Sequence, residues 1–395
     1  MNKKNKEGQT LMESLKFHDK LLMIPGPTNI HPRVLKAMST PIISMTDKQF
    51  FKVMGEIQEG VRYLMKTKNH WTMVLSGTGT SAMEASICNL LEPGRRLMSL
   101  VSGYWGERVA NMAERMNIDT IRVRSRKMGM PFMLHEIEDA LKINRPDVLY
   151  VCHGDSSTGL LQPLEGIGNL CRKYDCILLV DGVVSLGSAP LNMDQLNIDV
   201  LYSAGQKALS GPPGVAPISL NDRAVEKIRT RKTSVPSFYM DLTLVARSWG
   251  IVEHGKFPYH YTPAINTLFG LREAIAMVIE EGIDQLVRRH QKSQILFESM
   301  LQQMGLSFYI NQANHRLSAI ISVLVPNDID AVRVMRYLDE EHKILIGGPL
   351  LVDSNVPKFW RIGFLGTNAN PKSISRTCQA LSKALSEQRA LKSRL

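Results

Sequence analysis

Residues 198–207 read Ile198-Asp199-Val200-Leu201-Tyr202-Ser203-Ala204-Gly205-Gln206-Lys207, and a Gly/Pro cluster follows at 211–214. The apolar run at the start predicts a buried strand, and the cluster at the end cannot continue a helix. Lys207 therefore lies on a short connection just after a strand. A lysine in such a place is either a solvated loop residue or an amine that the fold positions. The rest of the chain must decide between the two.

Apolar runs alternate with helical patterns along the part of the chain that surrounds this stretch. Besides 198–202, strands are predicted at 71–75, 97–101, 120–123, 148–152 and 177–180. Strands that alternate with helices at this spacing are typical of βαβ units and a mainly parallel sheet. Such sheets bind ligands at the carboxyl ends of their strands.

The pattern changes beyond Thr262, where two long helical segments lead into shorter strands. The helices are predicted at 264–282, 283–304 and 328–341, and the strands at 307–310, 319–325, 344–346 and 360–364. We therefore predict an α/β protein with an N-terminal arm at 1–20, a large domain at 21–281 and a smaller α+β domain at 282–395.

The composition of the 395 residues limits the classes of partner. No window approaches the roughly 18 uninterrupted apolar residues of a membrane span. The net charge is +11, but the Lys and Arg residues are spread along the chain, and neither a zinc-ligand spacing nor an RNA-binding signature is present. The five cysteines are odd in number and form no CxxC pair, which favours a reducing compartment. We expect no membrane, nucleic-acid or metal partner.

Further polar features fall at predicted strand ends. Residues 76–80 (Ser-Gly-Thr-Gly-Thr) join a strand to a helix, and free N–H groups at a helix start suit a phosphate; a plain glycine-rich turn is the alternative. Asp181 ends an apolar strand, where a carboxylate is costly unless it meets a cation; capping of the next turn is the alternative. Arg361 lies in an apolar strand, where its planar fork would bind a carboxylate or form an internal salt bridge.

Taken together, these features fit pyridoxal phosphate. Lys207 would form a Schiff base with its aldehyde, and Asp181 would keep the pyridine nitrogen protonated, so that the ring becomes an electron sink. Arg361 would hold the carboxylate of an amino acid and orient its Cα–H bond. Lys207, once released, would act as the general base. The strands before Asp181 and Lys207 are consecutive, which predicts that both residues lie at one edge of the sheet.

The sequence resembles the class V, fold-type I pyridoxal-phosphate-dependent aminotransferases, and among them most the animal alanine–glyoxylate (serine–pyruvate) branch. The resemblance runs from about Leu21 to the last predicted helix and is densest at 153–159, 161–164, 176–181, 202–209 and 360–363. It implies a fold-type I transferase that moves the amino group of alanine or serine to glyoxylate or pyruvate by a ping-pong mechanism.

The resemblance also implies roles for single residues. Lys207 is the Schiff-base lysine and Asp181 the partner of the pyridinium. Arg361 binds the substrate carboxylate, and Gly26 leaves room beside it. Ser156 lies near the ring oxygen and the substrate.

For the remaining cofactor contacts, the resemblance implies three groups. The phosphate is bound by Thr78, Gly79 and Thr80 with help from Gln206. Trp105 stacks on the pyridine ring, and Val183 packs on its other face. Tyr259 and Thr262 reach the phosphate of the neighbouring subunit. The resemblance therefore implies a homodimer with shared active sites.

The sequence departs from the family pattern at several points, among them Gly182 after the aspartate, Thr80 where histidine is common, and Ile24 where glycine is usual. No catalytic group is lost, but the preferred amino acid stays open. A 3-hydroxykynurenine transaminase of the same subfamily is the alternative. From a different class, the chain could be a catalytically inactive basic binding protein on this scaffold, against which the intact Lys207 and Arg361 argue.

The chain ends in Ser393-Arg394-Leu395. This tripeptide is similar to Ser-Lys-Leu, the peroxisomal address that an import receptor reads. In a eukaryotic source it predicts a peroxisomal location. The alternative is a basic helix end without a targeting role, and then a cytosolic protein.

Overall fold

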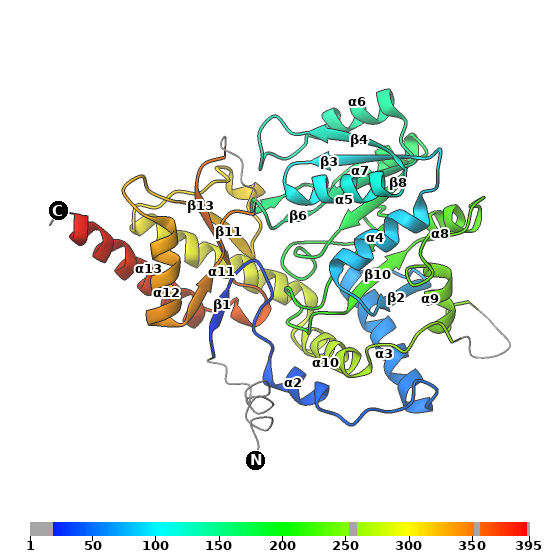
Figure 1. The fold of residues 1–395 in the computed structure, drawn as a ribbon, viewed down its shortest axis with the longest axis horizontal. Helices are drawn as coiled ribbons and strands as arrows, with labels where there is room; N and C mark the ends of the chain where they lie inside the picture. Colours follow the sequence, from blue (N-terminus) through cyan, green and yellow to red (C-terminus); the bar gives the residue numbers. More distant parts are fainter. Residues whose placement is uncertain (1–18, 253–258, 351–355, 393–395) are drawn as a thin grey trace, which may run out of the picture.

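The computed structural model describes residues 19–252, 259–350 and 356–392. The predicted arm at 1–20 falls almost entirely outside the described residues, and so does the tripeptide 393–395. Figure 1 shows two parts, a larger one built on a wide sheet and a smaller one that carries the C-terminal helix. Among the described residues, no helix is both long and apolar enough to cross a membrane.

A mixed, mainly parallel sheet forms the centre of the larger part, as the predicted α/β fold class requires. Its seven strands lie in the order β2-β10-β9-β8-β5-β3-β4. Their bounds are Trp71–Leu75 (β2), Arg96–Val101 (β3), Asp119–Arg124 (β4), Val148–Cys152 (β5), Ile177–Asp181 (β8), Val200–Tyr202 (β9) and Ala216–Leu220 (β10). Neighbours from β9 to β4 pair in parallel, and β10 runs antiparallel to both β9 and β2. The carboxyl ends of β8 and β9 therefore lie side by side.

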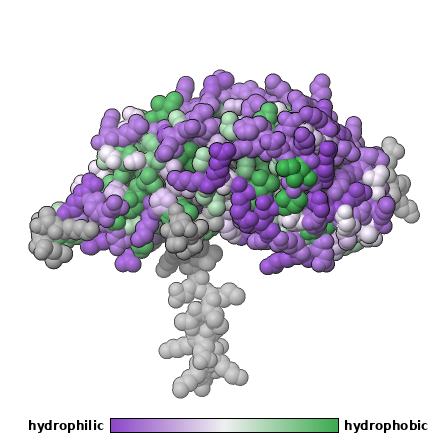
Figure 2. Space-filling model, turned by 90° about the horizontal axis from the view of Figure 1, so that it is seen from above, coloured by the Kyte–Doolittle hydropathy of each residue, from purple (hydrophilic) through white to green (hydrophobic). Residues whose placement is uncertain are grey.

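Helices surround this sheet, and their apolar faces join it in one continuous core. Their bounds are Pro32–Met38 (α2), Lys48–Met65 (α3), Gly79–Leu90 (α4), Tyr104–Arg115 (α5), Leu134–Asn144 (α6), Ile167–Lys173 (α7), Asp222–Arg229 (α8), Leu242–Ser248 (α9) and Ile265–Glu281 (α10). The face of the molecule seen in Figure 2 is mostly hydrophilic, with apolar side chains visible between the polar ones.

The smaller part has its own core, which includes Phe297, Trp360 and Phe364. Three helices, α11 (Ile283–Gln303), α12 (Ala331–His342) and α13 (Pro371–Lys392), pack with two short sheets. In one sheet β11 (Ile320–Leu324) pairs antiparallel with β13 (Phe359–Gly363), and in the other β1 (Leu21–Met23) pairs parallel with β12 (Ile344–Ile346). Thus β1, which falls within the range predicted for the large domain, pairs with the smaller part. The predicted domain boundaries themselves stay a prediction.

Two predicted details differ from the structure. The segment 307–310 is not a regular strand, because only Phe308 forms a bridge, with Val323 of β11. The strand β10, which lies between β2 and β9, is missing from the predicted elements. Its Pro217 has no N–H to donate, so it weakens the strand pattern, yet its carbonyl still accepts from the N–H of Ser203 (2.8 Å).

Candidate active site

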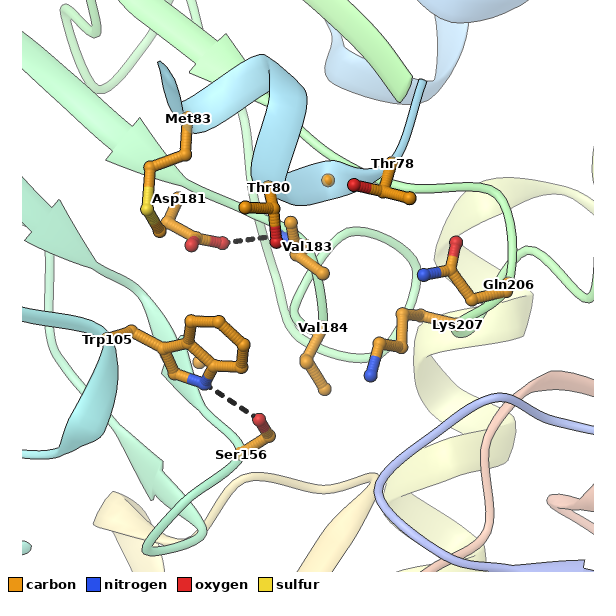
Figure 3. Close-up of a pocket in the computed structure, with 12 residues that line it drawn as sticks. Thr78, Thr80, Met83, Trp105, Ser156, Asp181, Val183, Val184, Gln206 and Lys207 are labelled. Atoms are coloured by element: carbon orange, nitrogen blue, oxygen red, sulfur yellow. Dashed lines mark hydrogen bonds between the residues drawn. The ribbon is translucent and has the colours of Figure 1, made fainter. Parts of the chain in front are cut away.

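A pocket opens at the carboxyl edge of the large sheet, where the connections after β2, β8 and β9 meet. It holds about 500 Å³ of empty space, part of it open to solvent. Figure 3 shows the side chains around it. It is lined by Thr78, Gly79, Thr80, Met83, Trp105, Gly154, Ser156, Asp181, Val183, Val184, Gln206 and Lys207. All of the predicted site residues except Gly26, Arg361, Tyr259 and Thr262 thus line one pocket.

Asp181 ends β8 and is buried in the pocket wall. Its Oδ2 accepts hydrogen bonds from the hydroxyls of Tyr202 (2.8 Å) and Tyr150 (3.1 Å), and its Oδ1 accepts from the N–H of Val183 (2.8 Å). Burial raises the pKa of Asp181 to about 6, although these donors favour the ionised form. The carboxylate is therefore fixed in place, and a positive group in the pocket would stabilise it.

Lys207 points into the same space from the connection after β9 (Figure 3). Its Nζ donates to the carbonyl oxygen of Pro25 (2.6 Å). Burial lowers the pKa of Lys207 to about 8; the charge of Asp181 opposes this shift and that of Arg361 adds to it. A useful fraction of the amine is then unprotonated near neutral pH, which both nucleophilic attack and proton transfer require.

The start of α4 forms the opposite end of the pocket. Thr78 is the N-cap residue, but its side chain makes no capping hydrogen bond. The first N–H groups of a helix have no acceptor within the helix, so those of Gly79 and Thr80 are available to an anion. Gln206 faces this end, and its buried Oε1 has no hydrogen-bond partner among the described residues. The predicted phosphate cradle is thus assembled from two separate segments, the start of α4 and the connection after β9.

Trp105 and Val183 line the pocket together, as the resemblance implies for the two faces of a flat ring. Trp105 lies in the first turn of α5, and its Nε1 donates to Ser156 Oγ (2.9 Å). This bond fixes the orientation of the indole.

Arg361, on β13 of the smaller part, lies beside the pocket and bonds to Ser156 in its wall. Its Nε donates to the carbonyl oxygen of Gly348 (2.7 Å) and its Nη1 to that of Ser156 (2.9 Å). The pKa of Arg361 is lowered, because the effect of burial outweighs the opposing charge of Asp155. Within the described part of the chain, no carboxylate forms a salt bridge with Arg361. The internal salt bridge considered from the sequence is therefore not observed, and the guanidinium remains free to bind a carboxylate from outside.

Three buried residues beside the site were not found from the sequence. Tyr150 and Tyr202 are the hydroxyl donors to Asp181. The sequence feature that could have identified them is a tyrosine in each of the two strands that flank β8. Asp155 is buried beside the start of α5, and its Oδ1 accepts from the N–H of Ser157 (2.8 Å). A Cβ on Gly103 would lie 2.1 Å from Asp155 Oδ2, so only glycine fits there.

The other predicted residues have separate positions. Gly26 lies against Lys207: an added Cβ would be 2.3 Å from the Lys207 Nζ. Tyr259 is 67% exposed, and Thr262 is exposed beside it, with 3.4 Å between their hydroxyl oxygens. Neither lines the pocket of its own chain. Their contact with the cofactor of a second chain stays a prediction.

The residues present fit pyridoxal phosphate. A dianionic phosphate matches the open N–H groups of α4, an aromatic ring matches the space between Trp105 and Val183, and an aldehyde matches the amine of Lys207. The buried carboxylate of Asp181 matches a protonated ring nitrogen.

Comparison with known proteins agrees with this geometry. The family model of the class-V aminotransferases matches residues 22–371. Alanine–glyoxylate aminotransferase of Mus musculus is 39% identical over 95% of this chain and 90% of its own length, and that of Drosophila melanogaster is 36% identical over 95% and 94%. The crystal structure of alanine–glyoxylate aminotransferase from Nostoc sp. superposes with a TM-score of 0.92 at 38% identity, covering 96% of this chain and 99% of that one. The chain therefore belongs to the class-V aminotransferase family.

Proposed function

We propose that this aminotransferase takes its amino group from alanine, with serine as a second donor, and passes it to glyoxylate or pyruvate. The enzyme class and the cofactor, pyridoxal phosphate, follow from the family. The observation that carries the proposal is the placement of Lys207 and Asp181 in one pocket, with Arg361 beside it and without an ion pair among the described residues. The names of the relatives support glyoxylate as the acceptor.

When bound, pyridoxal phosphate supplies an aldehyde that takes up the amino group and a ring that withdraws electrons from the substrate Cα. The protein supplies the rest. Arg361 binds the carboxylate that alanine, serine, glyoxylate and pyruvate share, and so fixes where the Cα lies. Lys207 moves a proton at that carbon, because its lowered pKa lets it both accept and donate near neutral pH. Asp181 holds a proton on the ring nitrogen.

Half-reactions test the substrates. We expect alanine and serine to convert the enzyme to its amino form, seen as loss of the visible absorbance of lysine-bound pyridoxal phosphate. Glyoxylate should restore that absorbance. Lys207→Ala should show no such absorbance from the start, whereas Lys142→Ala on the exposed side of α6 should behave as the wild type. Conversion by 3-hydroxykynurenine alone, with alanine and serine inactive, would replace this proposal by the alternative transaminase.

We further propose a homodimer in which Tyr259 and Thr262 complete the pocket of the partner. Their exposure supports this, and so do the neighbouring aromatic side chains: Phe238 is 71% exposed, and its ring centroid lies 5.0 Å from that of His260. The hydroxyl of Tyr239 donates to the carbonyl oxygen of Ser76, next to the phosphate cradle. An aromatic surface beside the pocket is a suitable place for a second chain.

For the location, we propose import into peroxisomes through Ser393-Arg394-Leu395 in a eukaryotic host. Support comes from the tripeptide alone. A fluorescent protein fused in front of residues 381–395 should enter peroxisomes, and the same fusion without the last three residues should stay in the cytosol. Equal distribution of both fusions would reject the targeting role.

A further inference from the structure

A second pocket lies where the end of α10, the first half of α11 and the start of α13 meet. It holds about 760 Å³ of empty space, part of it open to solvent. It shares no lining residue with the active-site pocket. Its wall includes the polar side chains of Glu281, Gln285, Arg288, Arg289, Lys292 and Ser293.

The charges in this wall do not balance. Arg289 pairs with Glu281 through Nε (2.6 Å) and Nη2 (2.9 Å), and its Nη1 donates to the carbonyl oxygens of Gly366 (2.6 Å) and Ala369 (3.0 Å). The Arg289–Glu281 pair has no net charge, and its hydrogen bonds join α10 and α11 to the segment before α13. Arg288 and Lys292 are four residues apart on α11 and therefore lie on one face of the helix.

Both of these cations are exposed, and neither has a counter-ion among the described residues. Arg288 donates through Nε to the Gln285 side chain (3.0 Å), which is neutral. Across the described ranges, no carboxylate forms a salt bridge with Arg288 or Lys292. Two positive charges thus face one cavity without compensation.

Ser293 adds a hydroxyl to the wall of this pocket. It lines the pocket, its exposed fraction is only 4%, and its hydroxyl has no hydrogen-bond partner in the part of the chain that the structure describes. Its oxygen is not among the buried unpartnered atoms, so the hydroxyl faces the open pocket and is available to donate to a ligand oxygen in place of water. The start of α13 adds to the positive potential: Pro371 has no N–H and Asn370 caps Ser373 (2.9 Å), which leaves the N–H of Lys372 open.

We propose that this pocket binds a small oxyanion, the phosphate or carboxylate group of a metabolite, between Arg288, Lys292 and the Ser293 hydroxyl. The guanidinium fork of Arg288 and the ammonium of Lys292 are the groups that bind such oxygens most strongly. The site is separate from the phosphate cradle of α4, so the cofactor and this anion bind together.

The experiment uses the enzyme loaded with pyridoxal phosphate, whose own phosphate fills the cradle. Inorganic phosphate and succinate are each titrated in by calorimetry at low ionic strength. We expect saturable binding of at least one of them, which also identifies the preferred group. The double variant Arg288→Ala/Lys292→Ala should bind on the order of tenfold or more weakly, and Ser293→Ala should show a smaller loss at unchanged charge.

Two controls separate binding at this pocket from a general effect of surface charge and from binding at the substrate site. Lys142→Ala/Lys383→Ala removes two charges from other exposed helix positions and should bind like the wild type. Arg361→Ala should also retain binding, because the anion does not occupy the substrate site. Loss of binding in Arg361→Ala with retention in the Arg288/Lys292 variant would overturn the proposal. So would equal losses in the two double variants, or no saturable binding of either anion.

Discussion

Asp181 is a buried carboxylate held by three neutral donors, and no cation among the described residues lies within hydrogen-bond distance of it. Its pKa of about 6 lies above the value near 4 of an unfolded chain. Burial is the main cause, and the second buried carboxylate, Asp155, acts in the same direction. A positive charge beside Asp181, such as that of a protonated ring nitrogen, would therefore stabilise its ionised form.

This pKa predicts how the stability of the cofactor-free protein depends on pH. Between pH 4 and 6 the folded state holds the Asp181 proton more tightly than the unfolded state, so this group's contribution to stability falls as pH rises. Asp181→Asn has no such proton. Relative to the wild type, the variant should therefore gain up to about 3 kcal/mol across this window. Unfolding free energies of the wild type and the variant at pH 4, 5 and 6 measure this change. A difference between the two proteins that does not vary with pH would contradict the raised pKa.

The position of Gly26 accepts only glycine, both for its backbone conformation and for the space around it. Its φ of +119° and its contact with Lys207 both exclude a side chain. Gly26→Ala should therefore disturb the lysine as well as strain the backbone.

Gly94→Ala is the matched control, because Gly94 has a φ of +88° but open space around its missing Cβ. Both variants should lose about 1 kcal/mol or more of stability from backbone strain. Only Gly26→Ala should also lose the visible absorbance of lysine-bound cofactor and bind the cofactor more weakly, on the order of tenfold. Equal cofactor binding by the two variants would show that Lys207 does not need this space.

At the scale of elements, α5 carries Trp105 to the pocket because it approaches β3 very closely. Gly106 makes this approach possible: a Cβ there would lie 2.5 Å from the carbonyl oxygen of Leu100. Ser99 strengthens the contact by donating through its hydroxyl to the Gly106 carbonyl oxygen (2.8 Å). The position of the indole is therefore set by helix–strand packing.

Two helical glycines test this. Gly106→Ala should move α5 away from the sheet and destabilise the protein by about 2–3 kcal/mol. A Cβ added to Gly55 in α3 would have no atom within 4 Å. Gly55→Ala should therefore stabilise the protein by roughly 0.5–1 kcal/mol, because alanine favours a helix more than glycine does. Denaturant midpoints report both, and Trp105 fluorescence should change only in Gly106→Ala. A neutral Gly106→Ala would disprove the tight packing.

At the scale of the whole molecule, the two parts of the chain meet at the site. Arg361 of β13 bonds to Ser156 after β5, and Thr28 donates through its hydroxyl to the carbonyl oxygen of Leu365 (2.7 Å). Arg361, which we predict to bind the substrate carboxylate, is thus fixed to the larger part by a direct hydrogen bond, whereas Tyr259 and Thr262 lie away from the pocket of their own chain.

Mixed dimers test whether a second chain supplies those two. Lys207→Ala and Tyr259→Ala/Thr262→Ala should each be poorly active alone. If sites are shared, one of the two sites in a mixed dimer contains only intact residues. Refolding the variants together should then give more activity than the sum of the two refolded separately. Simple additivity, or a monomer in sedimentation, would contradict the shared site.

Much of the fold and the pocket was predictable from the sequence. The alternating pattern indicated the parallel sheet, and the order of strand ends indicated that Asp181, Lys207 and residues 78–80 lie together, as they do in the pocket, because parallel strands share one carboxyl edge. The strand β10 was missed, since Pro217 weakens its pattern. Segment 307–310 was predicted as a strand because its residues are apolar, but apolar character does not guarantee a full ladder.

By itself, the sequence determined the reactive groups and their order along the chain, because helix and strand periodicity is a local property. Only the tertiary structure decided which distant residues meet. It placed Tyr150 and Tyr202 on Asp181, Gly26 against Lys207, and Arg361 beside Ser156, with no carboxylate of the described residues in an ion pair with Arg361. These contacts join residues far apart in the chain, and the packing of one element on another, which has no local sequence signal, brings them within reach.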